Sequence, residues 1–175
     1  MSTIKCKTQQ FLPRSKRFTY KKLSLSDLPY FESLARNSHI RQYLMEGMDV
    51  SSEDCLGWVK ASTELFKERA VGLYLVFQEG SLIGYAGFNK AHEGLDDIEV
   101  LFAFTKEHSG KGFATEVCSA LLDASCSYLK NTKIIAVAHP ENIASVKVLK
   151  KCGFVSTASG DGDLSHLLHF RFECL

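Results

Sequence analysis

The chain has almost no excess charge of either sign, because its 21 lysine and arginine residues nearly balance its 20 acidic residues and give a net charge of +1. Nucleic-acid-binding domains carry a basic patch or stripe, so this balance argues against a broad nucleic-acid interface. The sequence also lacks an apolar run of the about 20 residues that a transmembrane helix needs. Its first ten residues are polar and contain no apolar signal core. We therefore expect a cytoplasmic protein that binds neither nucleic acid nor a membrane.

A CxxC pair is also missing, although the chain has six cysteines. Free cysteines commonly behave as small hydrophobic residues. We therefore expect reduced thiols rather than a disulfide framework, and no cysteine nucleophile. Five histidines follow residue 90, and their spacing matches neither a zinc site nor a nucleophile motif. They are His92, His108, His139, His166 and His169. No bound metal is expected.

The length of 175 residues and the ordinary composition, 45% hydrophobic and 23% charged, fit one globular domain. The chain contains no internal repeat, linker or low-complexity segment. We expect a single domain over residues 1–175, in which residues 1–15 are loosely ordered.

Residues 98–116 read IEVLFAFTKEHSGKGFATE, which is the pattern of a strand, a glycine loop and a helix start. The first N–H groups of a helix have no partner within the helix, and the helix dipole adds positive charge there. Gly110 and Gly112 have no Cβ, so an anion can approach the backbone closely. The residues 109–115 therefore indicate a phosphate-binding loop. An ordinary tight turn between a strand and a helix has the same pattern.

Apolar periodicity predicts seven strands and about four helices. A helix at 113–131 lies between apolar strands at Ile98–Phe104 and Ile134–Ala138, and a right-handed crossover of this kind joins parallel strands. Residues 39–48 form either a short helix or an irregular loop. The other expected strands are 18–25, 73–77, 82–88, 154–157 and 164–174, and the other expected helices are 27–36, 51–66 and Ile143–Lys151.

Two common phosphate-binding motifs do not fit the glycine loop. A nucleoside-triphosphate P-loop requires glycine where this chain has Thr105, and serine or threonine where it has Gly112. A dinucleotide fingerprint requires a third glycine at Thr115, and no acidic residue ends the following strand to hold a ribose. The ligand is therefore not expected to be a nucleoside triphosphate or a dinucleotide.

The loop resembles a third motif. Residues 109–114 resemble the Gln/Arg-x-x-Gly-x-Gly/Ala signature of the GNAT superfamily of acetyl-CoA-dependent N-acyltransferases. Gly112 and Ala114 match this signature, whereas Ser109 departs from the usual glutamine or arginine. Similarity to the branch of the ribosomal-protein N-terminal (Rim-type) acetyltransferases extends from about residue 17 to 174, through the segments 23–28, 82–85, 110–116, 140–145 and 148–154.

The resemblance implies a mixed α/β GNAT fold. Its central sheet has about seven mostly antiparallel strands, and the parallel strands Ile98–Phe104 and Ile134–Ala138 splay apart. Acetyl-CoA (coenzyme A after transfer) would lie between these strands with its pyrophosphate on the glycine loop. The residues implied for its binding are Phe102, Phe104, Ser109, Gly110, Lys111, Gly112, Phe113, Ala114, Thr115, Asn142 and Ser145. Asn142 is also readable as a plain helix N-cap.

The resemblance further implies direct transfer of the acetyl group to a primary amine. Glu99 matches an acidic position of the branch and is the candidate general base. A glutamate at the solvent-facing start of a strand is the alternative. Leu149 stands where many members have the tyrosine that protonates the leaving thiolate, so Ser145 is the candidate for that role. Ser145 is otherwise an ordinary small helix residue.

The acyl acceptor is expected to bind against residues 39–60 and the loop 160–165. Tyr43, Met45, Met48 and Trp58 are candidates for lining that pocket together with Glu99, or else belong to the core. The resemblance suggests a protein or peptide N-terminus as acceptor, although polyamines, amino acids and antibiotics are acceptors within the same branch. A non-catalytic acyl-CoA-binding sensor or interaction module with this fold is the rival interpretation. The oligomeric state is not indicated.

Overall fold

The computed structural model of the chain describes residues 12–44, 47–91, 97–126, 128–129, 132–158 and 164–174. The predictions made for residues 1–11, for Met45 and for loop residues 160–163 lie outside this range. The strands are β1 (Thr19–Lys22), β2 (Leu73–Gln78), β3 (Ser81–Lys90), β4 (Ile98–Phe104), β5 (Ile134–Ala138), β6 (Val155–Ser156) and β7 (Leu168–Phe172). The α-helices are α1 (Leu28–Ala35), α2 (Ser38–Leu44), α3 (Ser52–Arg69), α4 (Phe113–Ser125) and α5 (Ile143–Lys151), with short 3₁₀ turns at Leu25–Asp27 and Lys106–His108.

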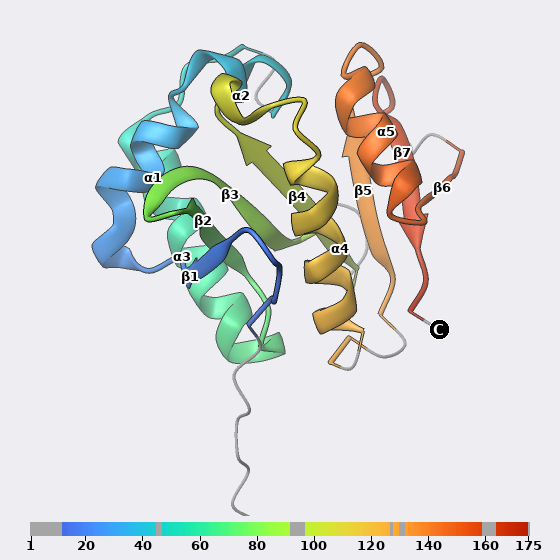
Figure 1. Cartoon of the computed structure of the whole chain (residues 1–175), viewed down its shortest axis with the longest axis horizontal. Helices are drawn as coiled ribbons and strands as arrows, with labels where there is room; N and C mark the ends of the chain where they lie inside the picture. The colour runs from blue at the N-terminus through green and yellow to red at the C-terminus, as the bar shows by residue number, and fades with distance from the viewer. Residues whose placement is uncertain are drawn as a thin grey trace, which may run out of the picture.

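The strands form one seven-stranded sheet in the order β1-β2-β3-β4-β5-β7-β6 (Figure 1). Every neighbouring pair is antiparallel except β4 and β5, which are parallel and joined through α4. This confirms the expected GNAT-type sheet. β4, β5 and α5 have the bounds that the sequence predicts, because each begins and ends at an abrupt change from apolar to polar or turn-forming residues.

The structure decides one open alternative and shifts several element ends. Of the two alternatives for residues 39–48, the short helix is present as α2, so the described chain has five α-helices rather than about four. The strand expected at 18–25 is confined to Thr19–Lys22, and the helix expected at 51–66 runs from Ser52 to Arg69. α4 ends at Ser125 instead of near residue 131, since the Ser125 carbonyl accepts from the N–H groups of Tyr128 and Leu129, both at 2.8 Å, and closes a tight turn. In the tail, Leu164 begins a turn and the last strand is confined to Leu168–Phe172.

Helices cover both faces of the sheet. One buried cluster joins α4 and α5 to strand residues that include Val100, Phe104 and Ala136. On the opposite face, α1 and α3 pack on Leu75, Tyr85 and other residues of β2 to β4. Alternate residues of a strand point to opposite faces, so the two clusters interleave along β2, β3 and β4. Figure 1 shows α4 and α5 together on one side and α1 on the other.

β4 and β5 separate soon after they meet. They pair only at Ile98 with Ile134 and at Glu99 with Ile135, whereas β3 pairs with β4 from Gly84 to Lys90. In Figure 1 the two strands diverge toward the top of the view. Backbone N–H and C=O groups that face such a gap lack ladder partners and need others. The splay expected from the resemblance is therefore present, and it begins beside Glu99.

Local signals explain the helix ends near this gap. The Asn142 side chain accepts a hydrogen bond from the N–H of Ser145 at 3.1 Å and caps α5. At the other end Gly153 has φ of +89°, the left-handed conformation that glycine adopts without strain. Phe154 is then buried and its N–H bonds to the Leu149 carbonyl at 3.0 Å.

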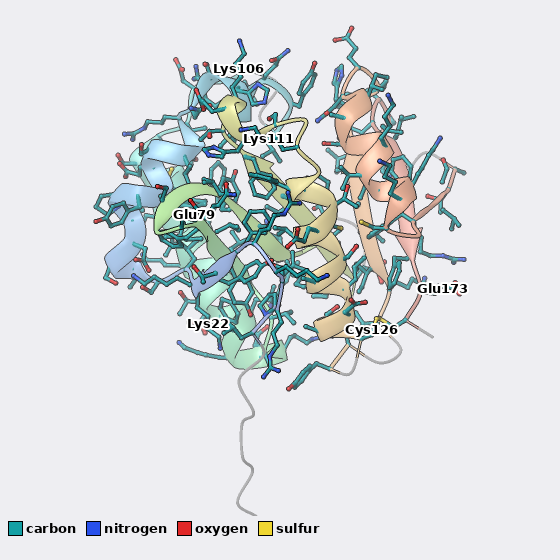
Figure 2. The ribbon with its side chains drawn as sticks, in the orientation of Figure 1. Lys22, Glu79, Lys106, Lys111, Cys126 and Glu173 are labelled. Carbon is teal, nitrogen blue, oxygen red and sulfur yellow. A yellow bond between two sulfur atoms is a disulfide. The ribbon has the colours of Figure 1, made fainter. Side chains whose placement is uncertain are left out.

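The cysteines depart from the expectation of reduced thiols only. Cys126, after the end of α4, and Cys174, beyond β7, are joined by a disulfide with a Cα–Cα distance of 5.1 Å (Figure 2). Cys55, Cys118 and Cys152 are free thiols. The pairing was missed because its two ends lie 48 residues apart and meet only through the crossover and the return of β7 along β5. Within the described segments, none of the helices is long and apolar enough to cross a membrane.

Replacing Cys126 by serine should lower the thermal stability. Opening a cross-link over 48 residues restores conformational freedom to the unfolded chain. The expected loss is about 2–4 kcal/mol of unfolding free energy, or roughly 5–15 °C in Tm, measured by calorimetry. Dithiothreitol should lower the Tm of the wild type to the same value and leave that of the variant unchanged. Equal melting of wild type and variant without reductant would contradict the cross-link.

Candidate functional site

One cavity of about 850 Å³ passes through the gap between β4 and β5. Its walls come from α1, α2, α3, β3 and β4, from the glycine loop and the first turn of α4, and from β5 and α5. Side chains of both sheet faces therefore line the same space. A ligand threaded through the gap can meet a second molecule that enters from the α1–α3 side.

The glycine loop forms one end of this cavity. Gly110 and Gly112 have φ of +75° and +76°, and α4 begins at the next residue, Phe113. The N–H of Glu116 bonds to the Gly112 carbonyl at 3.2 Å, so the N–H groups of residues 113–115 have no acceptor within the helix. These donors, the helix dipole and the missing Cβ atoms favour an anion at this end.

Arg17 adds a cation at the same end, a contribution that the sequence did not reveal. Its Nε lies 2.6 Å from Oε2 of Glu116, its Nη1 lies 3.4 Å from the Lys111 carbonyl, and its guanidinium stacks 4.6 Å from the Phe113 ring centre. A Cβ on Gly112 would lie 4.0 Å from Arg17 Nη2. The N-terminal segment is therefore fastened to the first turn of α4, with its guanidinium beside the glycine loop.

Ser109, which replaces the glutamine or arginine of the resembling motif, is also linked to a distant segment. The Nε2 atom of His39 in α2 lies 2.9 Å from the Oγ atom of Ser109, at hydrogen-bond distance. Both residues line the cavity. α2 is thus tied directly to the glycine loop. No sequence signal connects positions 39 and 109, because this contact depends on how α2 lies over the end of β4.

Of the residues that the resemblance implied for cofactor binding, all but one line this cavity. The exception is Lys111, whose side chain is exposed and whose Nζ lies 6.0 Å from the Phe113 ring centre. Figure 2 labels Lys111 at the loop that precedes α4. The others are Phe102, Phe104, Ser109, Gly110, Gly112, Phe113, Ala114, Thr115, Asn142 and Ser145.

Glu99 lies where the gap opens. It is half-buried, lines the cavity, and is the last β4 residue that pairs with β5. Across the antiparallel pair it stands directly opposite Asn89 of β3, so both side chains point to the α1–α3 face. A carboxylate and an amide are therefore held at the point where both halves of the cavity meet.

Ser145 and Asn142 line the cavity from the start of α5. The capping bond to the Ser145 N–H uses the Oδ1 atom of Asn142, so the N-cap interpretation describes an observed contact. Leu149 is buried in the core, also beside the cavity, and brings no hydroxyl there. Ser145 is the hydroxyl that the first turn of α5 places at the gap.

The α1–α3 half of the cavity includes both aromatic residues that were expected there, Tyr43 and Trp58. The Tyr43 ring lies 6.0 Å from that of His139, and Trp58 packs edge to face against Phe31. Met48 is 64% exposed and is not among the described residues that line the cavity. The expectation for Met48 was therefore wrong.

The chain is similar in sequence and in structure to known acetyltransferases. The family model described as "Acetyltransferase (GNAT) domain" matches residues 17–155. "Uncharacterized N-acetyltransferase YnaD" of Bacillus subtilis (strain 168) is 27% identical over 139 residues, 79% of each chain. An acetyltransferase from Agrobacterium tumefaciens str. C58 has a TM-score of 0.77 at 20% identity, covering 91% of this chain and 92% of that one. The ribosomal L7/L12 alpha-N-protein acetyltransferase RimL, solved with coenzyme A, has a TM-score of 0.73 at 16% identity, covering 93% and 97%.

The contact between Arg17 and Glu116 predicts a pH dependence of stability. Burial acts to raise the pKa of the Glu116 carboxyl, but the hydrogen bonds and charge of Arg17 outweigh it, so the pKa is lowered. A carboxyl with a lowered folded-state pKa stabilises above its unfolded value of about 4.3, and this contribution is lost as the pH falls through the folded-state pKa. Glu116→Gln should therefore cost about 1–2 kcal/mol at pH 7, and less below about pH 4.

Chemical denaturation at several pH values measures this difference. Glu64→Gln is the matched control, since Glu64 pairs with Lys67 on the exposed surface of α3 and should change stability little. A constant difference between wild type and Glu116→Gln from pH 3 to pH 7 would contradict the assignment.

Proposed function

The chain belongs to the acetyltransferase (GNAT) family, and on this basis we propose that it transfers the acetyl group of acetyl-CoA directly to a primary amine. The observation that carries the proposal is the continuous cavity through the β4–β5 gap. It joins an anion-binding helix start to a pocket with Glu99 at the junction. The finer assignment, to the Rim-type branch with a protein or peptide N-terminus as acceptor, rests on the sequence resemblance and on the fold shared with RimL.

The residues of the gap fit acetyl-CoA. The free N–H groups of residues 113–115 suit its pyrophosphate, and the Arg17 guanidinium, paired with Glu116, lies beside the glycine loop. The backbone of β4 beyond Glu99 and of β5 beyond Ile135 has no partner across the gap and suits an amide-bearing arm. When bound, acetyl-CoA supplies an acetyl group activated as a thioester.

Glu99 is proposed to take the proton of the attacking amine. An alkyl ammonium is mostly protonated at pH 7, so the amine nitrogen must lose a proton before it can attack. The Glu99 carboxylate is half-buried on the acceptor side of the junction, where it can accept that proton directly or through one water. The position at the last paired residue of β4 holds this carboxylate on the rigid part of the sheet.

Ser145 is proposed to stabilise the sulfur that leaves. Its hydroxyl can donate a hydrogen bond to that sulfur as negative charge develops. The capping contact between its N–H and Asn142 keeps the residue at the gap. Many members of the superfamily have a tyrosine at the position of Leu149. Leucine has no hydroxyl, so this position cannot take that role here.

Replacing Glu99 by glutamine should lower kcat by about 10²–10⁴-fold and remove the limb of the pH profile that rises with deprotonation of the carboxyl. Release of coenzyme A in the presence of an accepted amine measures both quantities. Glu64→Gln, an isosteric change on the exposed face of α3, should leave the profile as it is. An unchanged pH profile in Glu99→Gln would reject the base. Binding of acetyl-CoA without turnover of any amine in a broad panel would instead support a non-catalytic sensor.

The glycine loop is tested by adding a single methyl group. Gly112→Ala adds a Cβ in the glycine loop, 4.0 Å from Arg17 Nη2, where it hinders the approach of an anion to the backbone. It should weaken coenzyme A binding about tenfold to a hundredfold, the loss of one charge-assisted hydrogen bond. Gly80→Ala is the matched control, because Gly80 has φ of +80° in the β2–β3 turn and also has open space around it. The two variants carry the same backbone strain. Calorimetric titration should find weaker binding in Gly112→Ala alone, and equal affinities would refute the site.

A further inference from the structure

The α1–α3 half of the cavity is built almost entirely of apolar and aromatic side chains. We call this half the acceptor chamber and define it by the lining residues Phe31, Ile40, Tyr43, Leu44, Trp58 and Tyr85. Phe31, Ile40 and Tyr85 form its buried inner wall, whereas Leu44 is 37% exposed at its mouth. The Phe31 ring packs edge to face against both Tyr85, at 5.0 Å, and Trp58, at 6.3 Å. The chamber walls are therefore aromatic and mutually supported.

Among the described residues that line the cavity, Glu99 is the one carboxylate. Burial raises the pKa of Tyr85, so its hydroxyl stays uncharged. The lysines of the cavity, Lys147 and Lys151, lie on α5, which packs on the other face of the sheet. Glu99 is thus the single described carboxylate at the floor of the chamber.

The histidines of the cavity do not supply further anion sites. His39 bonds to Ser109, and His108 lies 2.8 Å from the Thr105 hydroxyl. His139 accepts a hydrogen bond from the N–H of Glu141 through Nδ1 at 3.2 Å. Each imidazole is held by a neighbour, and none carries negative charge in any protonation state.

These observations decide between classes of amine. A cation moved out of water needs a counter-ion and hydrogen bonds at its new place. A polyamine or an aminoglycoside brings several cations, and the described lining, with its one carboxylate, pairs with only one of them. An amine on an apolar body instead places its single charge at Glu99 and buries its body against the aromatic wall, where aromatic pairs add favourable contacts.

We propose that the acceptor is a primary amine with a single positive charge on an apolar, aromatic-sized body. The proposal rests on the function proposed above and specifies its acceptor. The shared chemistry occurs in two sources, a free arylalkylamine and the amino terminus of a peptide with an aromatic first residue. Asn89, opposite Glu99, separates them, because its amide can hydrogen-bond the carbonyl next to a peptide's amino terminus and finds no such group on an arylalkylamine.

The test measures binding and turnover separately. Phenethylamine, the peptide Phe-Ala-Ala, the peptide Asp-Ala-Ala, spermidine and kanamycin are titrated into the coenzyme A-loaded protein by calorimetry, and are offered with acetyl-CoA in a coenzyme A release assay. Phenethylamine and Phe-Ala-Ala should exceed the other three by about tenfold or more in affinity and in kcat/KM. Tighter binding of spermidine or kanamycin would overturn the proposal.

The two sources and the two proposals remain distinguishable. A higher affinity and kcat/KM for Phe-Ala-Ala than for phenethylamine, with the difference lost in Asn89→Ala, would identify a peptide terminus as the acceptor. The reverse order would identify a free arylalkylamine. Both outcomes support the proposed chemistry. Selective binding of aromatic monoamines without any turnover would support the acceptor class while refuting acetyl transfer. Turnover of spermidine with rejection of aromatic monoamines would support acetyl transfer and refute the proposed acceptor class.

Variants of the chamber provide matched controls. Trp58→Ala should raise KM for the preferred amine about tenfold, the effect of one lost aromatic contact, with a smaller change for methylamine. Tyr30→Ala is the control, since Tyr30 is an aromatic residue of α1 that is 61% exposed and outside the cavity. Leu44→Glu, at the exposed mouth, should lower the preference for aromatic amines over spermidine at least about tenfold. An unchanged preference in both Trp58→Ala and Leu44→Glu would place the acceptor elsewhere and overturn the proposal.

Discussion

The whole site depends on the loss of pairing between two parallel strands. β4 and β5 share only two residue pairs, Ile98 with Ile134 and Glu99 with Ile135, and then separate. Each strand keeps a full partner on its outer side, β3 for β4 and β7 for β5. The sheet therefore remains continuous and rigid while its centre opens. The gap leaves backbone donors and acceptors exposed to the cavity, and it connects the two faces of a sheet that would otherwise keep two ligands apart.

Segments remote in sequence complete the two ends of this gap. Arg17 brings the N-terminal strand to the first turn of α4 through Glu116, and His39 brings α2 to the glycine loop through Ser109. The same α2 helix supplies Ile40, Tyr43 and Leu44 to the acceptor chamber. One short helix thus touches the anion-binding end and the acceptor end. This arrangement gives the departure at Ser109 a structural counterpart, since a serine leaves room for a side chain from another helix to reach the loop.

Most of the fold and about half of the site followed from local patterns. The bounds of β4, β5 and α5 were predictable because an apolar run, a capping asparagine and a left-handed glycine are encoded within a few residues. The glycine loop was proposed from its local pattern, and Glu99 and Ser145 were proposed from the family resemblance; the structure places all three at the cavity. The end of α4 at Ser125 and the exposed position of Met48 were not predictable, because packing against other elements overrides weak local preference there. For residues 39–48 the sequence left a short helix and an irregular loop open, and the structure has the helix Ser38–Leu44.

The sequence by itself indicated the family and, through the resemblance, Glu99 as the candidate base, and its strand–loop–helix pattern suggested the anion site because that chemistry is local. Only the tertiary structure decided what surrounds them. It paired Cys126 with Cys174 and placed Arg17 and His39 beside the glycine loop. It left the Lys111 side chain exposed, outside the described cavity lining, and it surrounded the proposed acceptor side with aromatic residues and, among the described residues, one carboxylate. These contacts join positions tens of residues apart, and their existence depends on the crossover, the sheet order and the way α1 to α3 close over one face.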